Sequence, residues 1–163
     1  MKAAAVVLAL LASVMPISLV AAEEFPEGSQ GRLVLERNGS GPREVVTVLR
    51  QLPPPEFRSR FPVLLRVKWG YQSLPTGMPT EAEIVRGREL YSKLDAILGP
   101  NGVWAMSRTG DGGRTMYYYV KTASSYQVAL TSYFDSLPPI SVKIKATPEP
   151  EWSSVREVLS GVR

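Results

Sequence analysis

The sequence contains neither cysteine nor histidine. Without these residues the chain has no Ser-His-Asp or Cys-His nucleophile, no thiolate, and no zinc or copper site of the usual ligand types. No serine stands three residues ahead of a lysine, the spacing that places a serine nucleophile beside a lysine base on one helical turn. The composition therefore argues against an enzyme, and we expect no metal and no cofactor. It also predicts a fold held by packing alone, without disulfides.

The sequence also lacks a strong charge of one sign. Its formal net charge is +4, and removal of Lys2 with the leader described below leaves +3. This mild basic bias favours anionic surfaces but falls short of the charge that a dedicated nucleic-acid-binding protein carries. We therefore expect an anionic ligand or a protein as partner, and not nucleic acid.

Long hydrophobic runs are absent apart from Ala3 to Val14, which follows Lys2 and precedes small residues ending at Ala22. This pattern predicts a secretory signal peptide over residues 1–22, with an anchor that stays attached as the alternative. We expect a periplasmic or secreted bacterial protein that meets the membrane only through this leader. Residues 23–60 would form a hairpin and a proline-rich linker, and residues 61–163 the main domain.

Alternating and helical patterns divide the rest of the chain into elements. Strands are predicted over 32–37 and 43–50, joined at Asn38-Gly39, and Pro53-Pro54-Pro55 predicts an extended linker. From residue 61 the patterns first predict a strand over 62–71 and a helix from the Thr80 cap to Gly99. A hairpin of 102–108 and 114–121 follows, and then a helix from Ser124 or Ser125 to Leu137. A strand over 140–146 and a helix over 151–162 end the series.

This order, β-α-β-β-α-β followed by a helix, predicts an α+β fold of the ferredoxin-like split βαβ type with an N-terminal β-hairpin. Both long helices would then cover one face of the sheet and leave the other face open. Ile84 and Val128 are among the apolar residues expected to face the sheet from these helices.

Alternation along the strands assigns side chains to the open face. The candidate binding residues on that face are Arg66, Lys68, Tyr117, Tyr119, Lys121, Lys143 and Lys145. Tyrosines beside cations could bind a planar anionic ligand or a protein. In the alternative, the N-terminal hairpin covers this face with Val34, Val46 and Val48, and the tyrosines belong to the core.

Three segments resemble the bacterial family named domain of unknown function 695. They are Gly77-Met78-Pro79-Thr80, the run from Gly113 to Tyr119, and Pro150-Glu151-Trp152, and the resemblance spans about residues 56–162. The resemblance implies the α+β fold but no known activity. Relatives of this domain occur joined to a regulator of ribonuclease E. The resemblance therefore implies that members of the family act by binding other proteins.

Three functions remain open from the sequence. The first is an exported, non-enzymatic binding module that uses the open face. The second is a glycan hydrolase with paired carboxylates, for which the candidates are Glu83, Glu89, Asp111, Glu149 and Glu151. The third is a structural homo-oligomer joined through a sheet edge, with Trp104 as its anchor.

Overall fold

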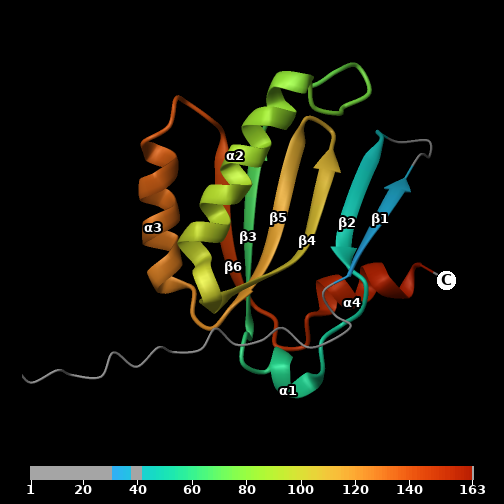
Figure 1. Cartoon of the computed structure of the whole chain (residues 1–163), viewed down its shortest axis with the longest axis vertical. Coiled ribbons are helices and arrows are strands. Elements are labelled where there is room, and N and C mark those ends of the chain that lie inside the picture. The colour runs from blue at the N-terminus through green and yellow to red at the C-terminus, as the bar shows by residue number, and fades with distance from the viewer. Residues whose placement is uncertain (1–30, 38–41, 163) are drawn as a thin grey trace, which may run out of the picture.

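The computed structural model describes residues 31–37 and 42–162, which form an α+β fold around one six-stranded antiparallel sheet (Figure 1). The strands are β1 (Arg32–Arg37), β2 (Glu44–Leu49), β3 (Val63–Gly70), β4 (Gly102–Gly110), β5 (Gly113–Val120) and β6 (Val142–Pro148). The helices are α1 (Pro55–Arg58), α2 (Glu81–Leu98), α3 (Ser124–Asp135) and α4 (Ser153–Ser160), with a 3-10 turn, η1 (Gly99–Asn101).

The element predictions are confirmed, with ends that differ by up to two residues. Helix α1 was not predicted, because a single turn begun by Pro55 carries no periodic pattern. At the start of α2, the hydroxyl of Thr80 accepts the Glu83 backbone N–H at 3.4 Å, as the capping pattern predicts. The turn at Asn38-Gly39 lies outside the described residues.

The order of the strands in the sheet is β1-β2-β4-β5-β3-β6. The N-terminal hairpin thus lengthens the sheet, because β2 pairs with β4 and places Val46 opposite Arg108. The hypothesis that the hairpin lies over a sheet face is therefore wrong. Trp104 does not lie on an edge strand, since β4 has neighbours on both sides.

Helices pack against both faces of this sheet, so the expectation that one whole face is open is also wrong (Figure 1). One face packs against α2 and α3, in the α2–α3 core. Its buried residues are Leu65, Val67, Trp69, Leu90, Leu94, Leu98, Met116, Tyr118, Val120, Leu130 and Phe134. The other face packs against α1 and α4, in the α4 core. Its buried residues are Val46, Val48, Leu49, Phe57, Phe61, Leu64, Val103, Ala105, Met106, Tyr117, Tyr119, Trp152, Val155 and Val158.

Two residues expected to face the sheet lie outside both cores. Ile84 is 39% exposed and Val128 is 74% exposed. In α2, Leu90, Leu94 and Leu98 already fill the face that meets the sheet, so Ile84 lies outside it.

A β-bulge interrupts β4. Trp104 pairs with Tyr118 and Met106 pairs with Tyr117, so the register shifts between Trp104 and Met106. The extra residue changes which side chains share a face, because alternation restarts after it. Trp104 and Ser107 therefore lie on the α2 side of the sheet, while Met106 enters the α4 core.

Among the residues that the structure describes, no helix is long and apolar enough to cross a membrane.

Candidate anion-binding groove

The three consecutive tyrosines of β5 have three different environments. Tyr118 is buried in the α2–α3 core, where its hydroxyl donates to Asp95 Oδ1 at 2.9 Å. Tyr119 is fully buried in the α4 core, and Tyr117 lies at the margin of that core with 9% of its surface exposed. Burial, followed by the neighbouring carboxylates Asp95 and Glu149, raises the pKa of Tyr118 and of Tyr119 above the ordinary tyrosine value.

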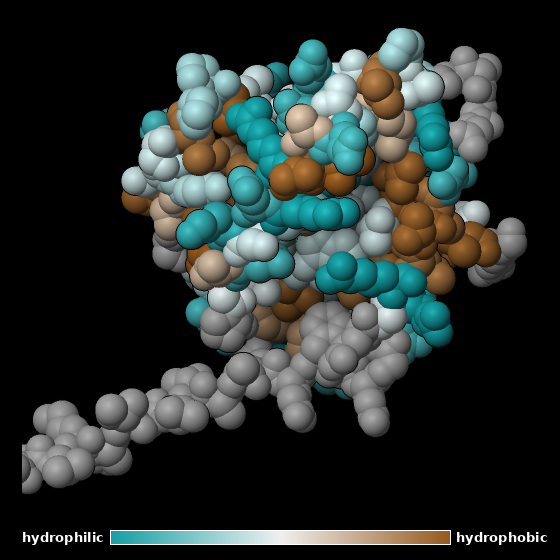
Figure 2. Space-filling view, turned by 45° about the horizontal axis from the view of Figure 1, so that its top comes forward, coloured by the Kyte–Doolittle hydropathy of each residue, from teal (hydrophilic) through white to brown (hydrophobic). Residues whose placement is uncertain are grey.

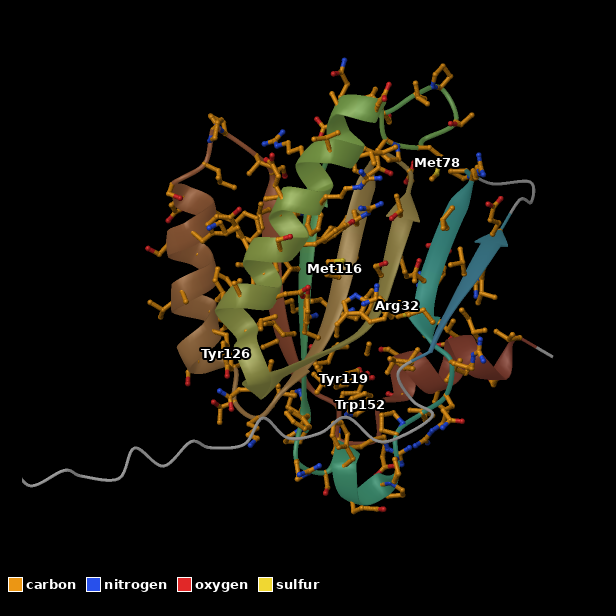
Figure 3. The ribbon with its side chains drawn as sticks, viewed as in Figure 1. Arg32, Met78, Met116, Tyr119, Tyr126 and Trp152 are labelled. Atoms are coloured by element: carbon orange, nitrogen blue, oxygen red, sulfur yellow. The ribbon has the colours of Figure 1, made fainter. Side chains whose placement is uncertain are left out.

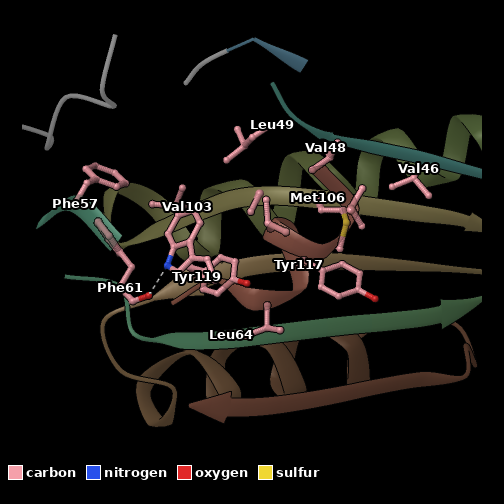
Figure 4. Packing of buried hydrophobic residues seen from close by; sticks show 14 residues of the cluster. Val46, Val48, Leu49, Phe57, Phe61, Leu64, Val103, Met106, Tyr117 and Tyr119 are labelled. Atoms are coloured by element: carbon pink, nitrogen blue, oxygen red, sulfur yellow. Dashed lines mark hydrogen bonds between the residues drawn. The ribbon is translucent and has the colours of Figure 1, made fainter. Parts of the chain in front are cut away.

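Tyr119 is therefore not available as a binding residue. Its ring stacks on Trp152 with the ring centroids 3.9 Å apart, and its hydroxyl donates to Glu149 Oε1 at 2.6 Å. The indole N–H of Trp152 donates to the carbonyl of Phe61 at 3.1 Å (Figure 4). The sequence could not show this burial, because α4 lies more than thirty residues after β5 and reaches the sheet only through tertiary packing.

The cover of α4 ends at Tyr117, whose hydroxyl is directed away from Tyr119 (Figure 4). Beyond it the same face of the sheet is hollowed into a groove of about 590 Å³. The groove is lined by Arg37, Pro42, Arg43, Glu44, Lys68, Arg108, Gly110, Asp111, Gly113, Thr115 and Tyr117. A smaller hollow of about 250 Å³ shares Arg37, Arg108 and Tyr117 with it and adds Arg66 beside α4.

Five of the predicted binding residues, Tyr117 and four cations, meet at this groove or directly beside it. In the register of the sheet, Arg66 lies between Tyr117 and Lys145, and Lys68 lies between Thr115 and Lys143. Since neighbouring strands are about 5 Å apart, these four cations occupy a compact patch, which we call the basic patch: Arg66, Lys68, Lys143 and Lys145.

The cations of the basic patch lack acidic partners in the part of the chain that the structure describes. No carboxylate there forms an ion pair with Arg66, Lys68, Lys143 or Lys145. The Nε atom of Arg66 is buried and has no hydrogen-bond partner among these residues. An anion at this place would thus supply an interaction that the described residues do not.

Lys121, by contrast, does not join the groove. It follows the far end of β5, and its ammonium group lies 5.6 Å from the ring centroid of Phe61. The structure thus brings Tyr117 and the four cations together and separates Tyr119 and Lys121 from them.

Three arginines of the groove were missed from the sequence: Arg37, Arg43 and Arg108. Arg108 forms an ion pair with Glu44, in which Nη2 donates to Oε2 at 3.2 Å, while Nε lies 3.0 Å from Oε1 without a hydrogen bond. Burial lowers the pKa of Arg108, but the hydrogen bond and charge of Glu44 outweigh it, and the pKa lies above the ordinary value. Only the pairing of β2 with β4 reveals this contact.

Of the five carboxylates considered for hydrolysis, Glu83, Glu149 and Glu151 form structural contacts. Glu149 accepts the backbone N–H of Ser154 at 2.7 Å as well as the Tyr119 hydroxyl. Glu83 follows the Thr80 cap and forms an ion pair with Arg86. Asp111 lies in the turn between β4 and β5 and has a positive φ of 49°. Within the described residues, no group of three acidic side chains could hold a metal ion.

Comparisons of the chain with protein-family models, with curated proteins and with solved structures find no match.

Proposed function

We propose that the protein is an exported, non-enzymatic module that binds an anionic ligand, either an acidic polymer or an acidic segment of a partner protein. The observation that carries this proposal is the basic patch beside the groove, whose cations form no ion pair with the carboxylates of the described residues. Export rests on the leader predicted over residues 1–22. The absence of an enzymatic role rests on the missing histidine and cysteine and on the structural contacts of the carboxylates.

The charge arrangement favours an extended anion over a single small ion. Lys143 and Lys145 are exposed on the edge strand β6, while Arg66 is half-buried against α4. Neighbouring like charges repel one another, and an anion that contacts several of them at once relieves this repulsion. The patch and the groove together span β6, β3, β5 and β4, so a ligand would lie across the strands.

We also infer that β3 to β6 with α2 and α3 form a ferredoxin-like split βαβ unit, extended by the hairpin. The order β4-β5-β3-β6 within the sheet supports this inference. Membership of the domain of unknown function 695 family stays a prediction. A structure of a family member that shares the contact between Trp152 and Tyr119 would support it.

The binding test uses heparin, a sulfated polysaccharide, as the probe. Lys68→Gln with Lys143→Gln removes two charges from the basic patch, and we expect the affinity to fall about ten-fold at low salt. The matched control is Arg88→Gln with Lys93→Gln, which removes two exposed cations of α2. Affinities of both double variants are measured by calorimetry at two salt concentrations, together with the melting temperature.

Equal losses in the two double variants would contradict a site at the groove, because net charge alone would then explain binding. Absence of binding to both heparin and poly-glutamate would contradict an anionic ligand. The alternative of a homo-oligomer joined through a sheet edge stays a prediction, but Trp104 does not support it because β4 is internal. The alternative of a glycan hydrolase has no observation in its favour.

A further inference from the structure

A second hollow lies on the opposite face of the sheet, between α2 and the strands β2 and β4. It has a volume of about 300 Å³, at the lower end of the range for small-molecule sites. Figure 3 places Met78 at one end of this cleft, Arg32 at the other end and Met116 between them. Figure 2, which looks onto the same face, shows the surface hollowed between long hydrophilic side chains.

The cleft exists because the sheet is wider than its helical cover on this side. α2 and α3 pack over β3, β5 and β6, whereas the hairpin extends the sheet past α2 (Figure 1). On the uncovered part, Thr47 pairs with Ser107, and Val45 pairs with Thr109. The bulge in β4 directs Trp104 to this side as well. The cleft thus combines an indole ring with a row of hydroxyl groups.

Arg114 is the most constrained cation of the cleft. Its Nε donates to the hydroxyl of Thr109 at 2.6 Å, and its guanidinium carbon lies 4.9 Å from the ring centroid of Tyr91. Gly87, inside α2, leaves room for the guanidinium, since a Cβ there would meet Nη1 at 3.3 Å. A glycine inside a helix lowers helix stability by about 1 kcal/mol relative to alanine. The space for the Arg114 guanidinium is therefore accompanied by a less stable α2.

Arg114 has no acidic partner among residues 31–37 and 42–162. Burial lowers the pKa of its guanidinium, which nevertheless stays charged at neutral pH. A half-buried arginine held by a hydroxyl and an aromatic ring is preorganised to bind an anion.

The other end of the cleft carries one charge of each sign, those of Arg32 and Asp95. Arg32 lies over Trp104, with its guanidinium carbon 4.3 Å from the ring centroid. Asp95 accepts the hydroxyl of Tyr118, and the charge of Arg32 acts on that same hydroxyl. An anionic group would therefore bind at the Arg114 end, and an apolar body would lie toward Trp104 and Met116.

We propose that this cleft binds a small amphipathic anion, in which a carboxylate or sulfonate contacts Arg114 and an apolar or aromatic body packs between Tyr91 and Trp104. The site is separate from the basic patch, because β2 and β4 present their opposite faces to the two hollows. Its ligand is a small molecule and not a polymer, since α2 and Met78 limit the cleft on one side.

The test compares two fluorescent probes that differ in one group. The first, 8-anilino-1-naphthalenesulfonate, carries an anion, and the second, N-phenyl-1-naphthylamine, has the same apolar body without it. We expect the purified protein to bind the sulfonate at least ten-fold more tightly than the amine. Arg114→Gln should remove this difference, whereas Arg108→Gln, in the groove on the other face, should leave it unchanged.

A second variant keeps the test decisive if Arg114→Gln alters the fold, which near-UV circular dichroism detects. Ser107→Phe fills the cleft from β4 and retains both arginines, and it should abolish binding of both probes. Equal affinities for the two probes, loss of binding in Arg108→Gln alone, or no binding of the sulfonate would each overturn the proposal. The heparin test uses variants of other residues. A negative result for one of the two proposed sites therefore does not contradict the other proposal.

Discussion

At the scale of the residue, neighbouring side chains of β5 serve different parts of the molecule. Tyr118 and Tyr119 point to opposite faces, as strand alternation requires. Each donates its hydroxyl to a different carboxylate, Tyr118 to Asp95 and Tyr119 to Glu149. Tyr117 shares a face with Tyr119 but lies where the cover of α4 ends. A run of three identical residues thus gives two core residues and one residue at the groove.

The raised pKa values of Tyr118 and Tyr119 predict a loss of stability at high pH. Above pH 10 the unfolded chain releases these protons while the folded chain retains them, so the free energy of unfolding falls as pH rises, and it is unaffected below. Each tyrosine contributes a slope of about 1.4 kcal/mol per pH unit. Tyr119→Phe should reduce the slope by that amount, measured by urea unfolding between pH 8 and about pH 11.

The control for this prediction is Ser154→Ala. It removes another hydrogen bond to Glu149, that of the Ser154 hydroxyl at 3.1 Å, without removing a titrating tyrosine. It should therefore lower stability at every pH and keep the wild-type slope. A Tyr119→Phe curve that runs parallel to the wild type above pH 10 would contradict the assignment.

At the scale of the element, α4 is held in place by the turn that precedes it. Trp152 adopts a left-handed conformation with φ of 53°, which is costly for a residue with a side chain. Its stacking on Tyr119 and its hydrogen bond to Phe61 offset that cost. Glu149 then accepts the N–H of Ser154, a free donor in the first turn of α4.

Glu149→Gln should therefore destabilise the protein by about 1.5–3 kcal/mol, because charge-assisted bonds from Tyr119 and from Ser154 are weakened together. The matched control is Glu157→Gln on the exposed surface of α4, expected to change stability by less than about 0.5 kcal/mol. Chemical denaturation of both variants at neutral pH gives the comparison. Equal effects of the two substitutions would mean that Glu149 does not hold α4.

At the scale of the whole molecule, the same sheet contributes to two hydrophobic cores, one on each of its faces. β5 contributes Met116, Tyr118 and Val120 to the α2–α3 core and Tyr117 and Tyr119 to the α4 core. Neither core can lose its packing without disturbing the strand that supports the other. We therefore expect a single cooperative unfolding transition.

Two tryptophans allow this expectation to be measured. Trp69 is buried in the α2–α3 core and Trp152 in the α4 core. Because the third tryptophan, Trp104, packs against both cores, it is replaced as well. The fluorescence of Trp104→Phe/Trp152→Phe then reports on the first core, and that of Trp69→Phe/Trp104→Phe on the second. For each variant the fluorescence and far-UV circular dichroism curves in urea should have the same midpoint. Separate midpoints within one variant would show that the cores unfold independently.

The sequence predicts what depends on local patterns. Alternation in 62–71 and 114–121 correctly assigns Leu65, Val67 and Tyr118 to one face and Arg66 and Tyr117 to the other. The basic patch follows from this assignment. The elements themselves follow from proline, glycine and capping residues, which act within a few positions.

What the sequence could not predict depends on contacts between distant segments. The free edge of β4 can pair with a further strand. The sequence of β2 does not show, however, whether β2 pairs with that edge or lies over a face of the sheet. The α4 cover over Tyr119 likewise requires a contact across more than thirty residues. These two contacts decide which candidate residues are buried and bring Arg37 and Arg108 to the groove.

The position of α4 in the chain has a consequence for biosynthesis. Strands β3, β4 and β5 leave the ribosome well before residues 149–160, which are needed to cover Tyr119 and seat Trp152. A nascent chain therefore presents an uncovered apolar sheet face until late in translation. On the proposal that the protein is exported, this delay would keep the polypeptide accessible to export chaperones for longer.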